Sequence, residues 1–181
     1  MWKIFLLTLS VAILSEADEE KKFKITLEKV EIETDPSFAT VKAEIRTEDG
    51  KTVVDASGNI LQEMDSGVFV DISASTESDP GQFKPLLKAT DIDFCKYDES
   101  NTMAPLLSMF IKDIEKFGNL PLKCPVKKGE FHIKGFNIAE ENLPSYIPEA
   151  RYLIESQIHV KKDGNRHVIY NSKWIALIAK E

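Results

Sequence analysis

The sequence contains only two cysteines and three histidines, and it lacks the short motifs of common enzyme classes. No Gly-x-Ser-x-Gly nucleophile elbow occurs, and neither a Walker-type nor a dinucleotide-binding glycine pattern is present. No serine stands in a setting that indicates an adjacent base. The many carboxylates, such as those of Asp91 and Asp93, are typical of a solvated strand face. We therefore expect a protein that is not an enzyme and that needs no cofactor.

Basic residues are scarce relative to acidic ones. The chain has 23 Lys and Arg against 30 Asp and Glu, which gives a net charge of −7. Nucleic acids and anionic membrane surfaces are bound through Lys and Arg that neutralise phosphates, so neither is an expected partner. The sequence also has no Asn-x-Ser/Thr acceptor, so N-glycosylation is not expected.

Only one long apolar run occurs, over residues 4–14. As a helix it would span about 16 Å, against a bilayer core of about 30 Å, so it is too short for a membrane span. Lys3 precedes the run and a small-x-small site at Ser15 to Ala17 follows it, which is typical of a secretory signal. A buried N-terminal helix would need a polar face that this run lacks. We predict a signal peptide at residues 1–17, one domain over residues 18–181, and a secreted, extracellular protein.

Two cysteines in a secreted chain most simply form one disulfide, here between Cys95 and Cys124. The alternative, two free thiols, is disfavoured in an oxidising compartment. The bridge would close a loop of about 30 residues, which stabilises a chain by about 3–4 kcal/mol. A single bridge cannot replace a hydrophobic core, so we expect one.

Apolar and polar residues alternate with a period of two over much of the chain, which predicts half-buried β-strands. A change of parity near Glu28 and Lys29 indicates a β-bulge. Asp49 and Gly50 predict a hairpin turn, and Pro85 favours an edge or irregular segment over residues 83–92. The strands are expected at residues 23–34, 39–46, 52–54, 68–74, 129–136, 152–160 and 168–178.

Polar stretches predict where these strands are interrupted. Residues 57–59 are expected to break the chain, and residues 75–82 to form a loop. One amphipathic helix is expected, capped by Asn101 or Thr102 and ended by a left-handed cap at Gly118 and Asn119. About eight strands and one helix indicate an all-β antiparallel sandwich.

The histidines were considered as metal ligands. His159 and His167 flank the turn at Asp163 and Gly164. A two-residue loop would place them on opposite faces, and a three-residue loop would place them on the same face. Lys161 and Arg166 crowd the second arrangement with positive charge, and no third ligand is evident, so no metal site is expected.

Several motifs resemble those of a known family. They are Phe94-Cys95 ahead of an amphipathic helix, Cys124-Pro125 followed by Gly129 and Phe131, Leu143-Pro144, Pro148, and Arg151-Tyr152. In this order they resemble a large insect family of small secreted proteins of unknown function, related to the ML-like lipid-recognition fold and including chemosensory groups. The resemblance implies an immunoglobulin-like β-sandwich with an apolar cup, as in the ganglioside-activator proteins, which use several disulfides where this chain can form one.

The function expected from this resemblance is binding of a hydrophobic small molecule, such as a lipid or a pheromone-like compound, in chemosensation or mating. A receptor protein is a further possible partner. The alternative is a secreted protein–protein interaction module with a filled core and no ligand. Large apolar residues that could line a cavity are Phe69, Phe83, Leu86, Leu87, Met103, Phe110, Phe117, Tyr152 and Trp174.

Overall fold

The structure is a computed structural model that describes residues 23–96, 113–140, 143, 147–162 and 164–180. The predicted signal peptide lies outside the described residues. The named elements, in chain order, are β1 (Phe23–Thr34), β2 (Ala39–Glu48), β3 (Lys51–Ile60), β4 (Val68–Asp79), β5 (Gln82–Asp93), the 3-10 helix η1 (Phe94–Lys96), β6 (Gly129–Phe136), β7 (Ala150–Lys162) and β8 (Asn165–Lys180).

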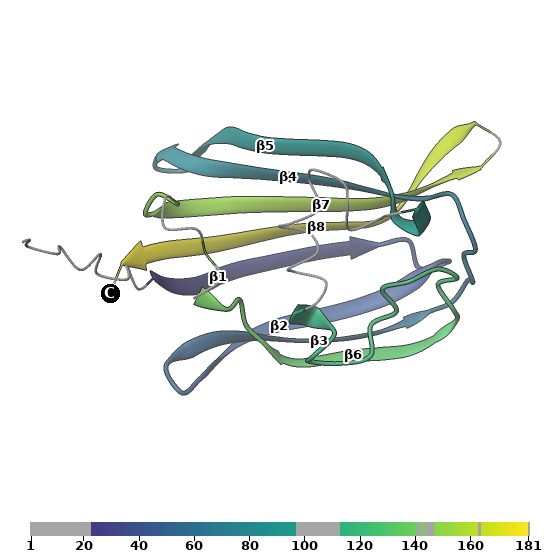
Figure 1. The fold of residues 1–181 in the computed structure, drawn as a ribbon, viewed down its shortest axis with the longest axis horizontal. Coiled ribbons are helices and arrows are strands. Elements are labelled where there is room, and N and C mark those ends of the chain that lie inside the picture. Colours follow the sequence, from purple (N-terminus) through teal and green to yellow (C-terminus); the bar gives the residue numbers. More distant parts are fainter. Residues whose placement is uncertain (1–22, 97–112, 141–142, 144–146, 163, 181) are drawn as a thin grey trace, which may run out of the picture.

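The strands form two sheets in which every pair is antiparallel (Figure 1). The larger sheet has the order β1-β8-β7-β4-β5, and the smaller has the order β2-β3-β6. The sheets approach each other at β1, which contacts β2 and β3, whereas β5 lies at the opposite edge of the larger sheet. The expected all-β antiparallel sandwich is confirmed.

Two local predictions are confirmed at the residues that motivated them. The register of β1 against β8 shifts between Leu27 and Lys29, which places the expected bulge at Glu28. Asp49 and Gly50 have φ angles of 49° and 78° and join β2 to β3. Positive φ at both central residues is the geometry of a two-residue hairpin turn, which Asp-Gly adopts readily.

The predicted break at residues 57–59 is wrong, because β3 continues to Ile60. Gly58 serves a close approach within the strand instead of ending it. A Cβ atom there would lie 2.1 Å from the carbonyl oxygen of Thr40 and 2.7 Å from the Phe131 ring. Glycine inside a strand often marks such an approach, so its presence alone does not indicate a turn.

The predicted loop over residues 75–82 is also wrong for most of its length. β4 runs to Asp79, and only Pro80 and Gly81 turn the chain, with Gly81 at a φ of 78°. Residues 78–82 are exposed at this end of the β4–β5 hairpin, which is why polar side chains are tolerated there. The expectation for the following segment is confirmed: β5 contains Pro85, forms the edge of the sheet, and pairs with β4 in a repeatedly shifted register.

Most of the predicted amphipathic helix falls on residues 97–112, outside the described residues. At its described end Asp113 and Ile114 are helical, and the Lys116 N–H donates to the Asp113 carbonyl in a turn. No helix in the described ranges is long and apolar enough to cross a membrane.

The predicted left-handed cap at Gly118 and Asn119 is wrong, since neither residue has a positive φ. Gly118 instead forms a β-bridge with Ile133 of β6. A Cβ atom on Gly118 would lie 1.8 Å from the carbonyl oxygen of His132, so the bridge requires glycine.

The described core has two clusters. The larger joins β1, β7 and β8 to the smaller sheet, and its buried members are Phe23, Ile25, Leu27, Val54, Tyr152, Ala176 and Ile178. The smaller cluster lies at β3, β6 and the segment before β6, and its buried members are Ile60, Val126 and Phe131. The larger cluster shows which side of the five-stranded sheet faces the other sheet.

Candidate functional site

The five-stranded sheet has an inner face, which we define as the side that carries Leu27, Tyr152 and Ala176 and packs on the three-stranded sheet. The opposite side is the outer face. Residues directly opposed in an antiparallel ladder place their side chains on the same face. The register therefore identifies the inner face on every strand, including the edge strand β5.

Three rows of side chains cross the inner face over all five strands. Most of their members are apolar, which is the composition expected of a buried surface. From β5 to β1, the rows are Leu87, Ala74, Ile154, Trp174 and Val30; then Ala89, Ile72, Ser156, Ser172 and Ile32; then Ile92, Val70, Ile158, Tyr170 and Thr34.

The inner face is covered unevenly. Toward the start of β1 and the end of β8 it is buried under the larger core cluster, as at Ile25 and Ala176, whereas in the three rows above only Ser172 is fully buried. On β4 and β5, all six inner-face members of these rows are only half-buried, and β5 has no fully buried residue. The face is therefore apolar beyond the area that the smaller sheet covers closely.

The nine residues considered as cavity lining are separated by the fold. Leu87, Tyr152 and Trp174 lie on the inner face. Phe69 and Phe83 lie on the outer face, opposite His159 and Glu77 respectively. The remaining four are Leu86, which is 58% exposed, Phe117, which packs edge-on against Phe136 at 5.6 Å, and Met103 and Phe110, which lie outside the described residues.

A small pocket lies beside β1 and β3, at one end of the larger core cluster. Its volume is about 10 Å³, which is room for one water molecule. It is lined by Ile25, Leu27, Lys51, Thr52, Asn137, Ile138 and Glu140. None of the nine residues considered from the sequence contributes to it.

Two serines interrupt the apolar inner face. Ser156 and Ser172 are directly opposed on β7 and β8, and their Oγ atoms are 2.8 Å apart. The Trp174 indole N–H donates to Ser172 Oγ at 3.0 Å. Ser172 is only 1% exposed and Ser156 is half-buried. The sheet therefore holds a small hydrogen-bonded group of polar atoms among apolar side chains.

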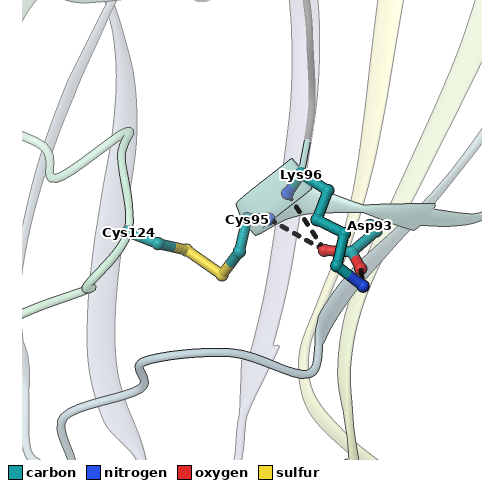
Figure 2. Close-up of a disulfide and its surroundings, with 4 residues drawn as sticks. All are labelled: Asp93, Cys95, Lys96 and Cys124. Atoms are coloured by element: carbon teal, nitrogen blue, oxygen red, sulfur yellow. Dashed lines mark hydrogen bonds and ion pairs between the residues drawn. A yellow bond between two sulfur atoms is a disulfide. The ribbon is translucent and has the colours of Figure 1, made fainter.

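The disulfide joins the two sheets at one end of the sandwich. Cys95, in η1 directly after β5, is bonded to Cys124, which precedes β6, with their Cα atoms 5.3 Å apart (Figure 2). The backbone N–H groups of Cys95 and Lys96 each donate to Asp93 Oδ1 at 3.1 Å. Asp93 therefore caps η1 and orients Cys95. The expected disulfide is confirmed.

The surroundings of Asp93 also change the pKa of its carboxyl group. Burial raises the pKa of its carboxyl group, but the hydrogen bonds from Lys96 and Cys95 and the charge of Lys96 together lower it more, so the pKa lies below its ordinary value. The carboxylate stays charged, as its capping role requires.

A second polar cluster surrounds His159 on the outer face of the sheet. The imidazole is 0% exposed and stacks on Phe69 with ring centroids 5.5 Å apart. Its Nε2 lies 3.1 Å from Asp91 Oδ1, and Lys161 Nζ lies 2.8 Å from the same oxygen. Nδ1 has no hydrogen-bond partner and lies 4.0 Å from Asp71 Oδ1.

The donor atoms of Asp71, Asp91 and His159 lie within 4.8 Å of one another, close enough to hold a metal ion. Both carboxylates are already paired, however: Asp91 with Lys161, and Asp71 with Arg166 at 2.6 Å. These cations supply the positive charge that a metal ion would bring, so we assign the cluster as an ion-pair network. The expectation that the chain has no metal site stays a prediction.

The register of the β7–β8 hairpin resolves the question of the two histidines. Val160 is opposite His167, as in the two-residue loop, and His159 and His167 lie on opposite faces. His167 Nε2 is 2.6 Å from Asp35 Oδ2, beyond reach of the His159 cluster.

Sequence reasoning did not identify Ser156 and Ser172. Their signal was nevertheless present, because both stand at positions where strand alternation calls for an apolar residue. Ser156 falls between Ile154 and Ile158, and Ser172 falls between Tyr170 and Trp174. A polar residue at an apolar position of a strand needs a buried partner or a role.

Comparison with known proteins shows a similarity for the middle of the chain. Residues 69–154 are similar to the family described as Protein of unknown function (DUF1091). The match covers a little under half of the chain, from the start of β4 to the first residues of β7, and it includes both cysteines and every motif that carried the family resemblance. No curated protein matches the chain.

Proposed function

We propose that this protein is a secreted binder of a hydrophobic small molecule, such as a lipid, and that the ligand lies on the inner face of the five-stranded sheet. The observation that carries the proposal is the half-buried apolar surface on β4 and β5. Apolar side chains that the smaller sheet does not bury closely can exchange water for an apolar ligand.

The energetics of such a ligand are favourable. Each buried methylene contributes about 0.8 kcal/mol, so an acyl chain of about ten carbons gains about 8 kcal/mol before ordering costs. The family resemblance supports the same reading, through its relation to the ML-like lipid-recognition fold and its chemosensory members. The wider role that we propose is carriage of a lipid or pheromone-like compound in chemosensation or mating.

A second function is favoured by one observation. The pocket at the end of the larger core holds only about 10 Å³, as expected of a filled core. A filled sandwich would act through its surface, as a secreted module that binds a receptor or another protein.

Native mass spectrometry of the disulfide-intact protein tests the proposal. We expect a stoichiometric apolar adduct, released on denaturation, or uptake of added lipids. A clean apo mass together with no uptake of any added lipid would refute the binding function and favour the interaction module.

A pair of variants locates the ligand. Ala74 lies on the inner face of β4, between Leu87 and Ile154, and its chain neighbour Ser75 lies on the outer face opposite Leu153. Ala74→Phe fills the space proposed for the ligand and should lower lipid affinity about tenfold. Ser75→Phe adds the same ring to the other face and should leave affinity unchanged. Circular dichroism establishes that both variants fold.

A further inference from the structure

Ser156 and Ser172 are the one directly opposed pair of serines in the rows that cross the inner face. Along β7, Ser156 has Ile154 and Ile158 as its inner-face neighbours. Along β8, Ser172 has Trp174 and Tyr170. The pair thus lies near the middle of the surface on which we propose that the ligand binds.

The hydrogen-bond donors of this group outnumber its internal contacts. Trp174 has an indole N–H that can only donate, and it donates to Ser172 Oγ. The two serines share one further contact, in which either hydroxyl is the donor. Three donors therefore make two hydrogen bonds, and one serine hydroxyl proton remains without an acceptor inside the group.

Tyr170 does not remove this excess. Burial raises the pKa of its phenol, and the hydrogen bond with Ser172 opposes that shift without cancelling it, so the phenol stays protonated at neutral pH. Tyr170 adds one contact to the group and one donor, so one hydroxyl proton is still in excess, and of the two serines only Ser156 is not fully buried. A donor left over in apolar surroundings costs about 1–3 kcal/mol unless it finds a partner.

Cross-strand serine pairs also stabilise sheets by themselves. That role explains the contact between the two hydroxyls. It does not explain why serines occupy positions of the inner face at which apolar side chains would bury more apolar surface. The surplus donor, its place in the middle of the face and the partial exposure of Ser156 together point to an acceptor that comes from outside the chain.

From this geometry we infer that the ligand carries an oxygen atom, as in a fatty alcohol, ketone or ester, and that this oxygen accepts a hydrogen bond from the Ser156–Ser172 pair. Pure hydrocarbons bind more weakly, because they leave the surplus donor unpaired. The inference rests on the proposed lipid-binding function and specifies the ligand class of that same site.

Displacement of the fluorescent probe N-phenyl-naphthylamine from the full, disulfide-intact chain tests it. The competitors are n-tridecane, n-dodecanol and the methyl ketone with the same number of heavy atoms, so that apolar surface is nearly matched. We expect the alcohol and the ketone to bind about five- to tenfold more tightly than the alkane, the worth of one buried neutral hydrogen bond. Equal affinity for all three compounds would overturn the inference.

Ser156→Ala tests the assignment to the serine pair. Ser156 is preferred to Ser172 because Ser172 also accepts the Trp174 indole, and its loss would disturb the buried group. Ser172 is only 1% exposed and cannot replace the lost half-buried hydroxyl as a donor to the ligand, so the variant should bind the alcohol and the ketone about five- to tenfold more weakly and the alkane unchanged. Ser75→Ala, on the outer face of β4, is the matched control and should keep the wild-type preference.

The outcomes distinguish a failure of this inference from a failure of the proposed lipid-binding function on which it rests. If no competitor and no probe binds, the lipid-binding function itself fails. If all compounds bind but Ser156→Ala keeps the full preference for oxygenated ligands, lipid binding stands and the serine assignment is wrong. If Ser156→Ala does not fold, the comparison of the three compounds on the wild-type chain still decides whether an oxygen atom is recognised.

Discussion

His159 Nε2 lies 3.1 Å from Asp91 Oδ1, although 68 positions separate the two residues in the chain. The contact joins β7 to the edge strand β5 across β4, and the imidazole is 0% exposed. Asp91 adopts a positive φ of 55° there, and its N–H donates to Asp71 Oδ1 at 2.7 Å. The irregular register of β5 is what brings its carboxylate over the buried histidine.

Replacing His159 should destabilise the protein. His159→Ala removes a buried ring stacked on Phe69 and the hydrogen bond to Asp91, and we expect a loss of about 2–4 kcal/mol in the free energy of unfolding. Urea unfolding of the disulfide-intact chain measures it. The matched control is His132→Ala, at an exposed position of β6, which should change stability by less than about 0.5 kcal/mol. Equal effects of the two variants would contradict the assigned role of His159.

The same cluster should make stability fall in acid. The hydrogen bond from Lys161 lowers the pKa of Asp91, burial opposes this, and His159 lowers it further, so the net pKa is below the ordinary 3.8. Burial raises the pKa of Asp71, but the Asp91 N–H and Arg166 lower it more, so it too lies below its ordinary value.

The sign of the effect follows from these directions. Below pH 3.8 the unfolded chain binds more protons than the folded one, so the stabilisation is complete above that pH and is lost as pH falls through the folded-state pKa values. Urea midpoints between neutral pH and pH about 2 should decrease accordingly. Asp91→Asn, which tolerates the positive φ, should flatten the decrease, whereas Asp65→Asn, at an exposed position, should not. An equally steep decrease in Asp91→Asn would rule out this origin.

Loss of the disulfide should remove the chain-entropy stabilisation of a loop whose two cysteines are 29 positions apart. In the double variant Cys95→Ala and Cys124→Ala, the free energy of unfolding is expected to be lower by about 3–4 kcal/mol. Chemical reduction of the wild-type chain should reproduce the shift, because it removes the same constraint without changing side chains elsewhere. If neither treatment moves the urea midpoint, the bridge does not stabilise the joint between the sheets.

The positions of most strands could be predicted because their signal is local. Period-two alternation placed the start of β1, of β2 and of β4 at the observed residues, and the parity change at Glu28 located a bulge. The errors arose where the same residue type is compatible with two different local structures. Gly58 permits a close approach within β3, and the polar residues at the end of β4 belong to a hairpin whose tip is exposed.

The candidate site was less predictable. Large apolar residues were chosen by size, and the fold places Leu87, Tyr152 and Trp174 on the inner face but Phe69 on the outer. Size does not report which face of a strand a side chain occupies. Parity within each strand would have placed Ser156 and Ser172 on the apolar face. It does not predict that the two residues lie opposite each other.

Local chemistry thus accounts for strand identity, the Asp49-Gly50 turn and the pairing of the only two cysteines. The tertiary structure decided sheet order, the register that sets Ser156 against Ser172, and the approach of Asp91 to His159. The physical reason is the range of the interactions. Alternation depends on neighbouring residues, whereas register depends on backbone hydrogen bonds between distant strands, where a shift by one residue exchanges the two faces.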